Sequence, residues 1–150
     1  MTEPRFAVGD ELTAPELYAL LTLRVEVFVV EQEAPYRELD GRDLLPDTVH
    51  LWSPPTGEPQ AYLRILREPN GVRRIGRVCT TKTARGTGLG RLLMTEAMVR
   101  IGDAEAVLDA QTYAQDFYAR FGFVPEGDPF YEDGIEHITM RRPPRLVRTG

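Results

Sequence analysis

The sequence predicts one α/β or α+β domain in which helices cover both faces of a central sheet. Three observations lead to this fold class. The chain has 150 residues, with 42% hydrophobic and 27% charged side chains, which is enough for the core of one globular domain. Strand-like segments alternate with three helix-like segments. No internal repeat or long linker divides the chain, so we expect one domain over residues 1–142 and a flexible basic tail over 143–150.

The N-terminal part of the chain predicts a short strand followed by a helix. Residues 6–8 suit a strand. Thr13 fits the N-cap of a helix, with Pro15 in the first turn and Glu16 at the capping-box position. Apolar residues then recur at helical spacing, so we expect a helix over about residues 14–29.

The middle of the chain predicts a loop and three strands. Residues 31–47 are acidic and contain Pro35, Gly41 and Pro46, which favours a loop with at most a short helix. Turn-forming residues then separate segments of high strand propensity. The expected strands cover residues 49–52, 60–67 and 72–80.

The second half of the chain predicts two more helices and the remaining strands. A stripe of apolar residues at helical spacing indicates a helix from Leu89 to Ile101 that ends at Gly102. After it we expect a strand over 106–111, a helix over 112–121, the start of a strand at 123–124, a loop over 126–133 and a last strand over 135–140.

Charge is unevenly distributed along the chain. The formal net charge of −5 disfavours a general nucleic-acid binder, because a phosphate backbone requires a basic surface. Residues 26–47 hold seven acids and two arginines, whereas residues 73–91 hold six basic residues and no acid. Such segments form either solvated faces or poles that attract opposite charge.

The single cysteine, Cys79, permits no intramolecular disulfide, which is typical of a cytoplasmic protein. The N-terminus lacks the features of a signal peptide, and no apolar run is long enough to cross a membrane. We interpret Cys79 as a small buried strand residue rather than a nucleophile. No His, Cys, Asp or Glu cluster has metal-ligand spacing, so we expect no metal.

The most informative segment is a glycine turn, Arg85-Gly86-Thr87-Gly88-Leu89-Gly90, between an expected strand and an expected helix. Glycines let backbone amides approach a ligand, and the helix N-terminus adds free N–H groups and positive potential. With Lys82 and Arg85 nearby, this predicts a site for a diphosphate. The turn fits neither a Rossmann fingerprint nor a P-loop. The alternative is a glycine-rich helix start that binds nothing.

Two motifs together resemble the GCN5-related N-acetyltransferase (GNAT) superfamily. The glycine turn matches the family's pyrophosphate-binding motif. The segment from Gln111 to Phe123 resembles the family's Asn-x-x-Ala-x-x-Leu/Phe-Tyr-x-x-x-Gly-Phe block, with Gln111 where many relatives carry Asn. The resemblance covers nearly the whole chain and implies the GNAT fold, a mixed, mostly antiparallel, twisted sheet with helices on both faces.

The N-terminal half narrows the resemblance. The segments 24–32, 35–41 and 134–138 resemble the ElaA-like branch of the superfamily. The Arg-x-x-Val-Phe start at Arg24 also resembles acyl-homoserine lactone synthases, which share the fold but are longer.

The resemblance implies an N-acetyltransferase that transfers an acetyl group from acetyl-CoA to a primary amine in a ternary complex. The implied donor site uses the amides of the glycine turn for the pyrophosphate and a strand edge for the pantetheine arm. Tyr118 is the implied general acid for the departing thiolate. The implied cofactor-binding residues are Val78, Cys79, Thr80, Arg85, Gly86, Thr87, Gly88, Leu89, Gly90, Gln111 and Tyr118.

The general base and the acceptor site are less defined by the sequence. His137 has a suitable ordinary pKa, and Glu33 lies in the acidic segment, so both are candidate bases. The acidic segment suggests that Glu31, Glu33, Asp40 and Asp43 bind a cationic amine of a small molecule or peptide. His50 is interpreted mainly as structural.

Other functions remain compatible with the sequence. They are an acyl-CoA-binding sensor without catalysis, a protein like the acyl-homoserine lactone synthases, and an interaction domain. We expect no nucleic-acid or membrane partner, and a homodimer is possible.

Overall fold

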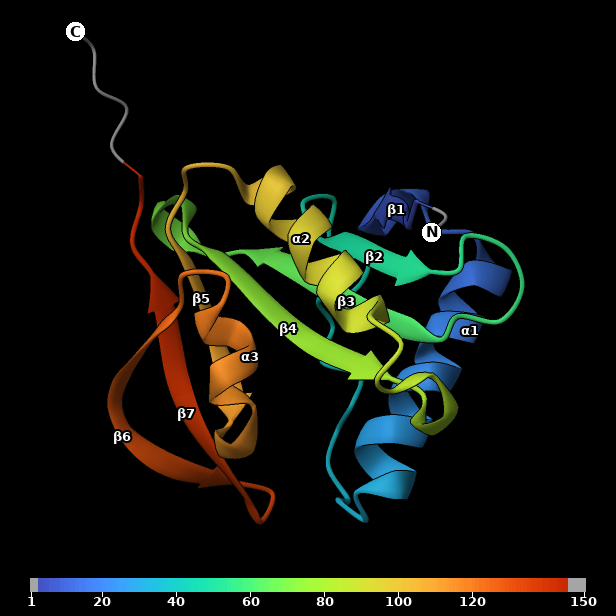
Figure 1. Cartoon of the computed structure of the whole chain (residues 1–150). Coiled ribbons are helices and arrows are strands. Elements are labelled where there is room, and N and C mark those ends of the chain that lie inside the picture. The colour runs from blue at the N-terminus through green and yellow to red at the C-terminus, as the bar shows by residue number, and fades with distance from the viewer. Residues whose placement is uncertain (1–2, 146–150) are drawn as a thin grey trace, which may run out of the picture.

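The structure, a computed structural model, describes residues 3–145, which form one seven-stranded sheet (Figure 1). The strand order is β1-β2-β3-β4-β5-β7-β6, and every neighbouring pair is antiparallel except β4 and β5, which are parallel. This confirms the predicted mixed, mostly antiparallel sheet. The strands are β1 (Arg5–Val8), β2 (Val49–Ser53), β3 (Ala61–Arg67), β4 (Arg73–Thr80), β5 (Ala106–Gln111), β6 (Val124–Glu132) and β7 (Ile135–Arg142).

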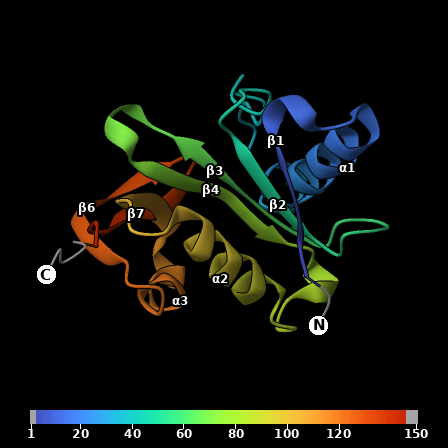
Figure 2. The same ribbon diagram turned by 90° about the horizontal axis from the view of Figure 1, so that it is seen from above.

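Helices lie on both faces of the sheet, as the sequence predicts. Figure 2 shows α1 (Ala14–Val25) on one face, with α2 (Leu89–Ile101) and α3 (Gln115–Ala119) on the other. The predicted N-cap of α1 is present, because the Glu16 N–H donates to Thr13 Oγ1 at 3.2 Å and the Thr13 N–H donates to the Glu16 carboxylate at 3.0 Å. Past Val25 the helix continues as a π-helical turn, Glu26–Glu31.

The two sheet faces carry two separate apolar cores. Alternation along the central strands sends Leu51 and Leu63 toward α2 and α3, and sends Trp52 and Tyr62 toward α1. All four side chains are 4% exposed or less. The sheet is therefore held between packed layers, and its strand ends are rigid supports for a site.

The sheet opens between β4 and β5. Their described pairing is limited to Arg73 with Ala106 and Arg74 with Val107, at the start of both strands. Beyond this point the two strands diverge (Figure 1). Backbone groups on their C-terminal halves are therefore left without the other strand as a partner.

The predicted loop over residues 126–133 is wrong for residues 126–132, which belong to β6, whereas Asp133 lies in the turn before β7. The strand is an exposed edge that contains Gly127 and Pro129, and its pairing with β7 shifts register between Glu126 and Phe130. An exposed, bulged edge lacks the apolar alternation that identifies a strand. The turn into β7 has positive φ at Asp133 (51°) and Gly134 (80°), and Asp-Gly is the sequence signal that indicates this hairpin.

The remaining predicted elements match the structure closely. The expected 112–121 helix consists of a 3₁₀ turn, Thr112–Ala114, followed by α3. The last strand extends to Arg142. Within residues 3–145, no helix has the length and apolar character needed to cross a membrane. Of the predicted flexible tail, residues 146–150 lie outside the described residues.

Candidate functional site

A cavity of about 950 Å³ occupies the opening between β4 and β5. One wall is the C-terminal half of β4, and the opposite wall is formed by β5, α3 and the start of β7. The glycine turn before α2 lies at the cavity as well. Most of the predicted site residues are therefore brought together in one place: Glu31, Val78, Cys79, Thr80, Arg85, Gly86, Gly88, Leu89, Gly90, Gln111, Tyr118 and His137 all line it.

The glycine turn has the backbone that an anion site requires. Gly86 and Gly88 have φ of 80° and 90°. Gly88 is the N-cap of α2 and, as a glycine, has no side chain to cap the first N–H groups of the helix. A Cβ at Gly86 would contact nothing within 4 Å, so the space beside the turn is open. The first N–H groups of the 13-residue helix α2 follow this turn. These features fit a diphosphate. Thr87 is the one predicted turn residue outside the cavity lining.

Arg85 already has a partner in the cavity. Its Nη2 donates to Glu31 Oε2 at 2.5 Å, and its Nε donates to the Thr80 carbonyl at 3.3 Å. Glu31 ends the π-helical turn after α1, so this ion pair links the glycine turn to the α1 side of the cavity. An anionic ligand at the turn would compete with Glu31 for the guanidinium.

Strand β4 carries a β-bulge in the cavity wall. Tyr62 pairs with Cys79 and Arg64 pairs with Gly76, so two residues of β4 lie opposite the single residue Leu63. A bulge leaves a backbone residue out of the ladder. Its N–H can therefore serve another acceptor.

Tyr118 and Cys79 are both buried at the cavity, with 9% and 5% exposure. Burial raises the pKa of the Tyr118 phenol, so at neutral pH it remains a proton donor. Burial also raises the pKa of the Cys79 thiol, so Cys79 is not a thiolate nucleophile at neutral pH. This agrees with the interpretation of Cys79 as a packing residue.

The two candidate bases lie in different places. His137 lines the cavity and stacks on Phe130, with ring centroids 5.9 Å apart. Its Nδ1 lies 2.8 Å from the Ile135 carbonyl, which only accepts, so Nδ1 is the donor in this contact. In a neutral ring, this arrangement leaves the lone pair on Nε2. Glu33 is exposed, follows the π-helical turn with φ of 51°, and does not line the cavity.

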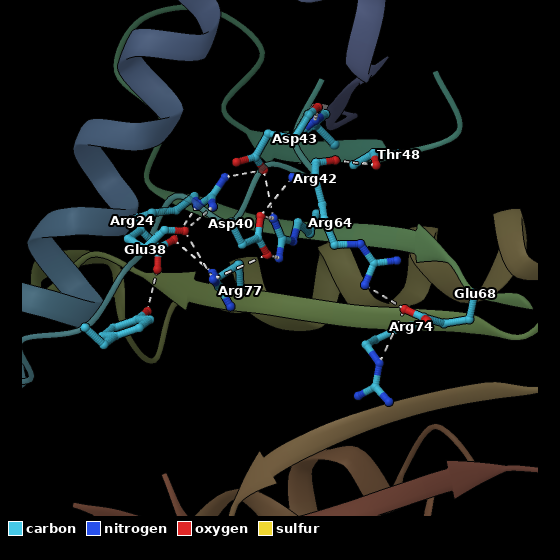
Figure 3. Close-up of polar contacts among 12 residues, drawn as sticks. Arg24, Glu38, Asp40, Arg42, Asp43, Thr48, Arg64, Glu68, Arg74 and Arg77 are labelled. Carbon is cyan, nitrogen blue, oxygen red and sulfur yellow. Dashed lines mark hydrogen bonds and ion pairs between the residues drawn. The ribbon is translucent and has the colours of Figure 1, made fainter. Parts of the chain in front are cut away.

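Asp40 and Asp43 lie outside the cavity lining, in a mostly buried cluster that we call the arginine–carboxylate network (Figure 3). Asp43 accepts from Arg24 at 2.7 Å and from Arg64 at 3.0 Å, and Arg64 also binds Asp40. Burial alone would raise the pKa of both aspartates, but these arginines outweigh it and hold both pKa values below their ordinary range. The network comprises Arg24, Glu38, Asp40, Asp43, Arg64 and Arg77.

The network shows that three carboxylates of the acidic segment are paired within the protein. Its three carboxylates are matched by three arginines from α1, β3 and β4, so it is neutral as a unit. Next to it, His50 is fully buried, with Nδ1 2.6 Å from the Tyr62 hydroxyl and Nε2 2.8 Å from the Asp43 carbonyl. This placement is structural. The sequence does not reveal these pairs, because the three arginines lie 14 to 39 residues from their partners along the chain.

Comparison with known proteins agrees with this geometry. The sequence profile of the family described as an acetyltransferase (GNAT) domain matches residues 22–143. The chain belongs to the GNAT acetyltransferase family. It is 51% identical over 148 residues to the UPF0039 protein Rv2851c of Mycobacterium tuberculosis, a match that covers 95% of each chain.

Two solved GNAT structures resemble this one over most of its length. The crystal structure of Escherichia coli ElaA superposes with a TM-score of 0.88 at 39% identity, covering 95% of this chain and 99% of that one. An acyl-CoA N-acyltransferase from Pseudomonas aeruginosa superposes with a TM-score of 0.85 at 45% identity, covering 93% and 99%. The chain therefore lies in the ElaA-like branch of the acyltransferases.

Residues of the sheet, the glycine turn and the neighbouring helices form the cavity. Among residues 3–145, no group of three His, Cys, Asp or Glu side chains is arranged to hold a metal ion. The bulge in β4 was not predicted, although Gly76, an isolated glycine inside the expected strand and next to Arg77, is a sequence signal for a bulge.

Proposed function

We propose that this protein is an acetyl-CoA-dependent N-acetyltransferase that acetylates a primary amine of a small molecule or peptide. One observation carries the proposal. A single cavity holds an open anion-binding turn, a β4 edge with a bulge, and the buried, protonated Tyr118. Acetylation of an amine by a thioester needs these three functions: donor binding, polarisation of the carbonyl, and protonation of the thiolate.

Each part of the donor has a proposed partner in the chain. Gly86, Gly88 and the N-terminus of α2 bind the pyrophosphate. The Arg85 guanidinium releases the Glu31 carboxylate and pairs with the pyrophosphate instead. The unpaired edge of β4 from Val78 to Thr80 hydrogen-bonds the pantetheine arm. The side-chain amide of Gln111 contacts the same arm from β5.

The transfer itself forms a C–N bond and breaks the C–S bond of the thioester. A backbone N–H at the β4 bulge polarises the carbonyl oxygen. His137 Nε2 accepts the proton that the ammonium loses, directly or through a water molecule, and the Tyr118 hydroxyl donates a proton to the thiolate. No covalent bond to the protein is required, because both substrates meet in the cavity.

The proposed acceptor remains a cationic amine, with a changed set of acidic residues. Asp40 and Asp43 are engaged in the arginine–carboxylate network, and Glu33 lies outside the cavity. Glu132 and Asp133, at the β6–β7 turn, line the cavity near His137 on β7. We propose that these two carboxylates, with Glu31, attract the amine.

The test measures CoA release from acetyl-CoA over a panel of cationic, neutral and acidic amines. We expect turnover with cationic amines, and a loss of roughly 10²-fold in kcat for Tyr118→Phe while acetyl-CoA affinity stays within about twofold. Tyr18→Phe is the matched control, because Tyr18 is an exposed tyrosine on α1 outside the cavity. Turnover only with neutral or acidic acceptors would contradict the proposed acceptor.

The same assay, together with acetyl-CoA binding and melting-temperature measurements, separates the alternatives. Acetyl-CoA binding without CoA release for any amine would favour a sensor. Turnover only with S-adenosylmethionine and a longer acyl donor would favour an acyl-homoserine lactone synthase activity. No increase in melting temperature with acetyl-CoA would favour an interaction domain. A cytoplasmic location and a homodimer stay predictions from the sequence.

A further inference from the structure

Arg77 has an unusual backbone for its position. Its φ is 53°, in the left-handed region that residues with a Cβ rarely adopt. The other described non-glycine residues with positive φ, Glu33, Asn70 and Asp133, lie in connections between strands or helices. Arg77 instead lies inside β4, at the bulge in the cavity wall. A strained residue of this kind persists only when its surroundings hold it in place.

The side chain of Arg77 has the contacts that would hold it. Its Nε donates to Glu38 Oε1 at 3.0 Å, and its Nη2 donates to the Glu38 carbonyl at 3.1 Å. Asp40 lies 3.6 Å from Nη2, and the guanidinium lies 5.8 Å from the centroid of the Tyr36 ring. The planar guanidinium is thus held through two of its nitrogens and across one face.

These contacts connect Arg77 to Glu38, a buried residue that has further partners. Glu38 is 5% exposed and accepts a second hydrogen bond at 2.6 Å from Arg24, which is fully buried on α1. Tyr36 also donates its hydroxyl hydrogen to Glu38. Figure 3 shows Arg77 and Arg24 converging on Glu38 from β4 and α1. The bulge is therefore tied through Glu38 to the helix on the far side of the sheet from α2.

We propose that Arg77 is a positioning residue whose side chain, held by Glu38, keeps the β4 bulge in the left-handed conformation that frees a backbone N–H for the thioester carbonyl. This inference rests on the proposed function, which assigns that N–H its role. Arg77 acts through its own backbone and does not need to touch the reacting atoms.

Substitutions of Arg77 by alanine and glycine distinguish this role from others. Alanine retains the Cβ that disfavours positive φ and loses the contacts with Glu38. Glycine loses the same contacts but adopts positive φ freely. If the guanidinium acts only by holding the backbone at positive φ, Arg77→Gly should retain most of the activity. If the guanidinium binds a substrate or stabilises charge, glycine and alanine are equally impaired.

We expect kcat to fall at least about tenfold in Arg77→Ala and to recover to within about threefold of wild type in Arg77→Gly, with acetyl-CoA affinity changed little in both. Arg77→Lys keeps the charge but not the fork, so we expect it to resemble Arg77→Ala. Arg73→Ala is the control, because Arg73 lies on the same strand, outside the cavity and without positive φ. Wild-type kcat in Arg77→Ala, or equal losses in Arg77→Ala and Arg77→Gly, would overturn the proposal.

A second measurement does not depend on turnover. Hydrogen exchange of the Tyr62 and Cys79 amides, which belong to residues paired beside the bulge, reports the local order of β3 and β4. We expect faster exchange in Arg77→Ala and exchange near wild type in Arg77→Gly and Arg73→Ala. Unchanged exchange in Arg77→Ala would overturn the positioning role. If the wild-type protein acetylates no amine, the proposed function fails while the exchange series still tests the positioning of the bulge.

Discussion

Replacing Arg24 by methionine should destabilise the protein strongly, because it removes a buried cation. Arg24 is 0% exposed and donates to Glu38 at 2.6 Å and to Asp43 at 2.7 Å. Removing one partner of a buried ion pair costs about 3–5 kcal/mol. Here each carboxylate keeps a second arginine at 3.0 Å, Arg77 for Glu38 and Arg64 for Asp43. We therefore expect the lower end, a loss of about 3 kcal/mol in the free energy of unfolding.

Urea unfolding followed by the fluorescence of Trp52, the single tryptophan, measures this loss. The melting temperature should fall by roughly 6–12 °C for a domain of this size. Arg5→Met is the control, because Arg5 pairs with Glu16 with its side chain 47% exposed, and should cost less than about 1 kcal/mol. A loss below about 1 kcal/mol for Arg24→Met would show that the network stabilises the fold no more than an exposed ion pair does.

Three further predictions concern the glycine turn, the cavity ion pair and the response to acid. Gly88→Ala puts a Cβ where φ is 90°, so acetyl-CoA should bind at least about fivefold more weakly, as measured by calorimetry. Gly57→Ala is the control, because Gly57 has φ of 82° but lies in the β2–β3 turn, and this variant should keep the affinity within about twofold. Glu31→Gln frees Arg85 from its 2.5 Å ion pair, so the affinity for acetyl-CoA should rise roughly two- to fivefold, and weaker binding would mean that Glu31 orients Arg85 for the donor. Burial lowers the pKa of His50, so the folded state favours the neutral ring and the free energy of unfolding should fall as pH decreases below about 6.5. His50→Gln should remove this part of the decline, and an equal decline in that variant would assign it to other groups.

Local signals in the sequence predicted the parts of the site that are built locally. The capping box at Thr13 and Glu16 is satisfied within three residues, so its pattern predicts the start of α1. Gly86 and Gly88 adopt the positive φ that favours glycine, and the helix follows them directly. These local signals predicted the turn and the strand before it, whereas the place of Tyr118 beside them was implied by the family resemblance; all three line one cavity.

Long-range pairing accounts for what the sequence did not reveal. Residues 26–47 suggested a negative pole, but the partners of Glu38, Asp40 and Asp43 are arginines 14 to 39 positions away. Such pairs have no fixed spacing, so charge counting along the chain cannot detect them. The positive φ of Arg77 is equally hidden, because it is imposed by Glu38 across the fold and not by its neighbours in sequence.

Because β4 and β5 pair only at their first residues, the substrate range of such a protein can change by substitution of a few side chains. In the proposed site the donor is held mainly by main-chain groups, and an amino-acid substitution does not delete a main-chain amide. The proposed acceptor side, by contrast, is formed by side chains at the β6–β7 turn and at the end of the π-helical turn after α1. Variation there can change which amine is accepted without loss of the donor. The donor and acceptor contacts thus share the gap in the sheet, but the donor contacts require a fixed backbone path and the acceptor side chains are free to vary.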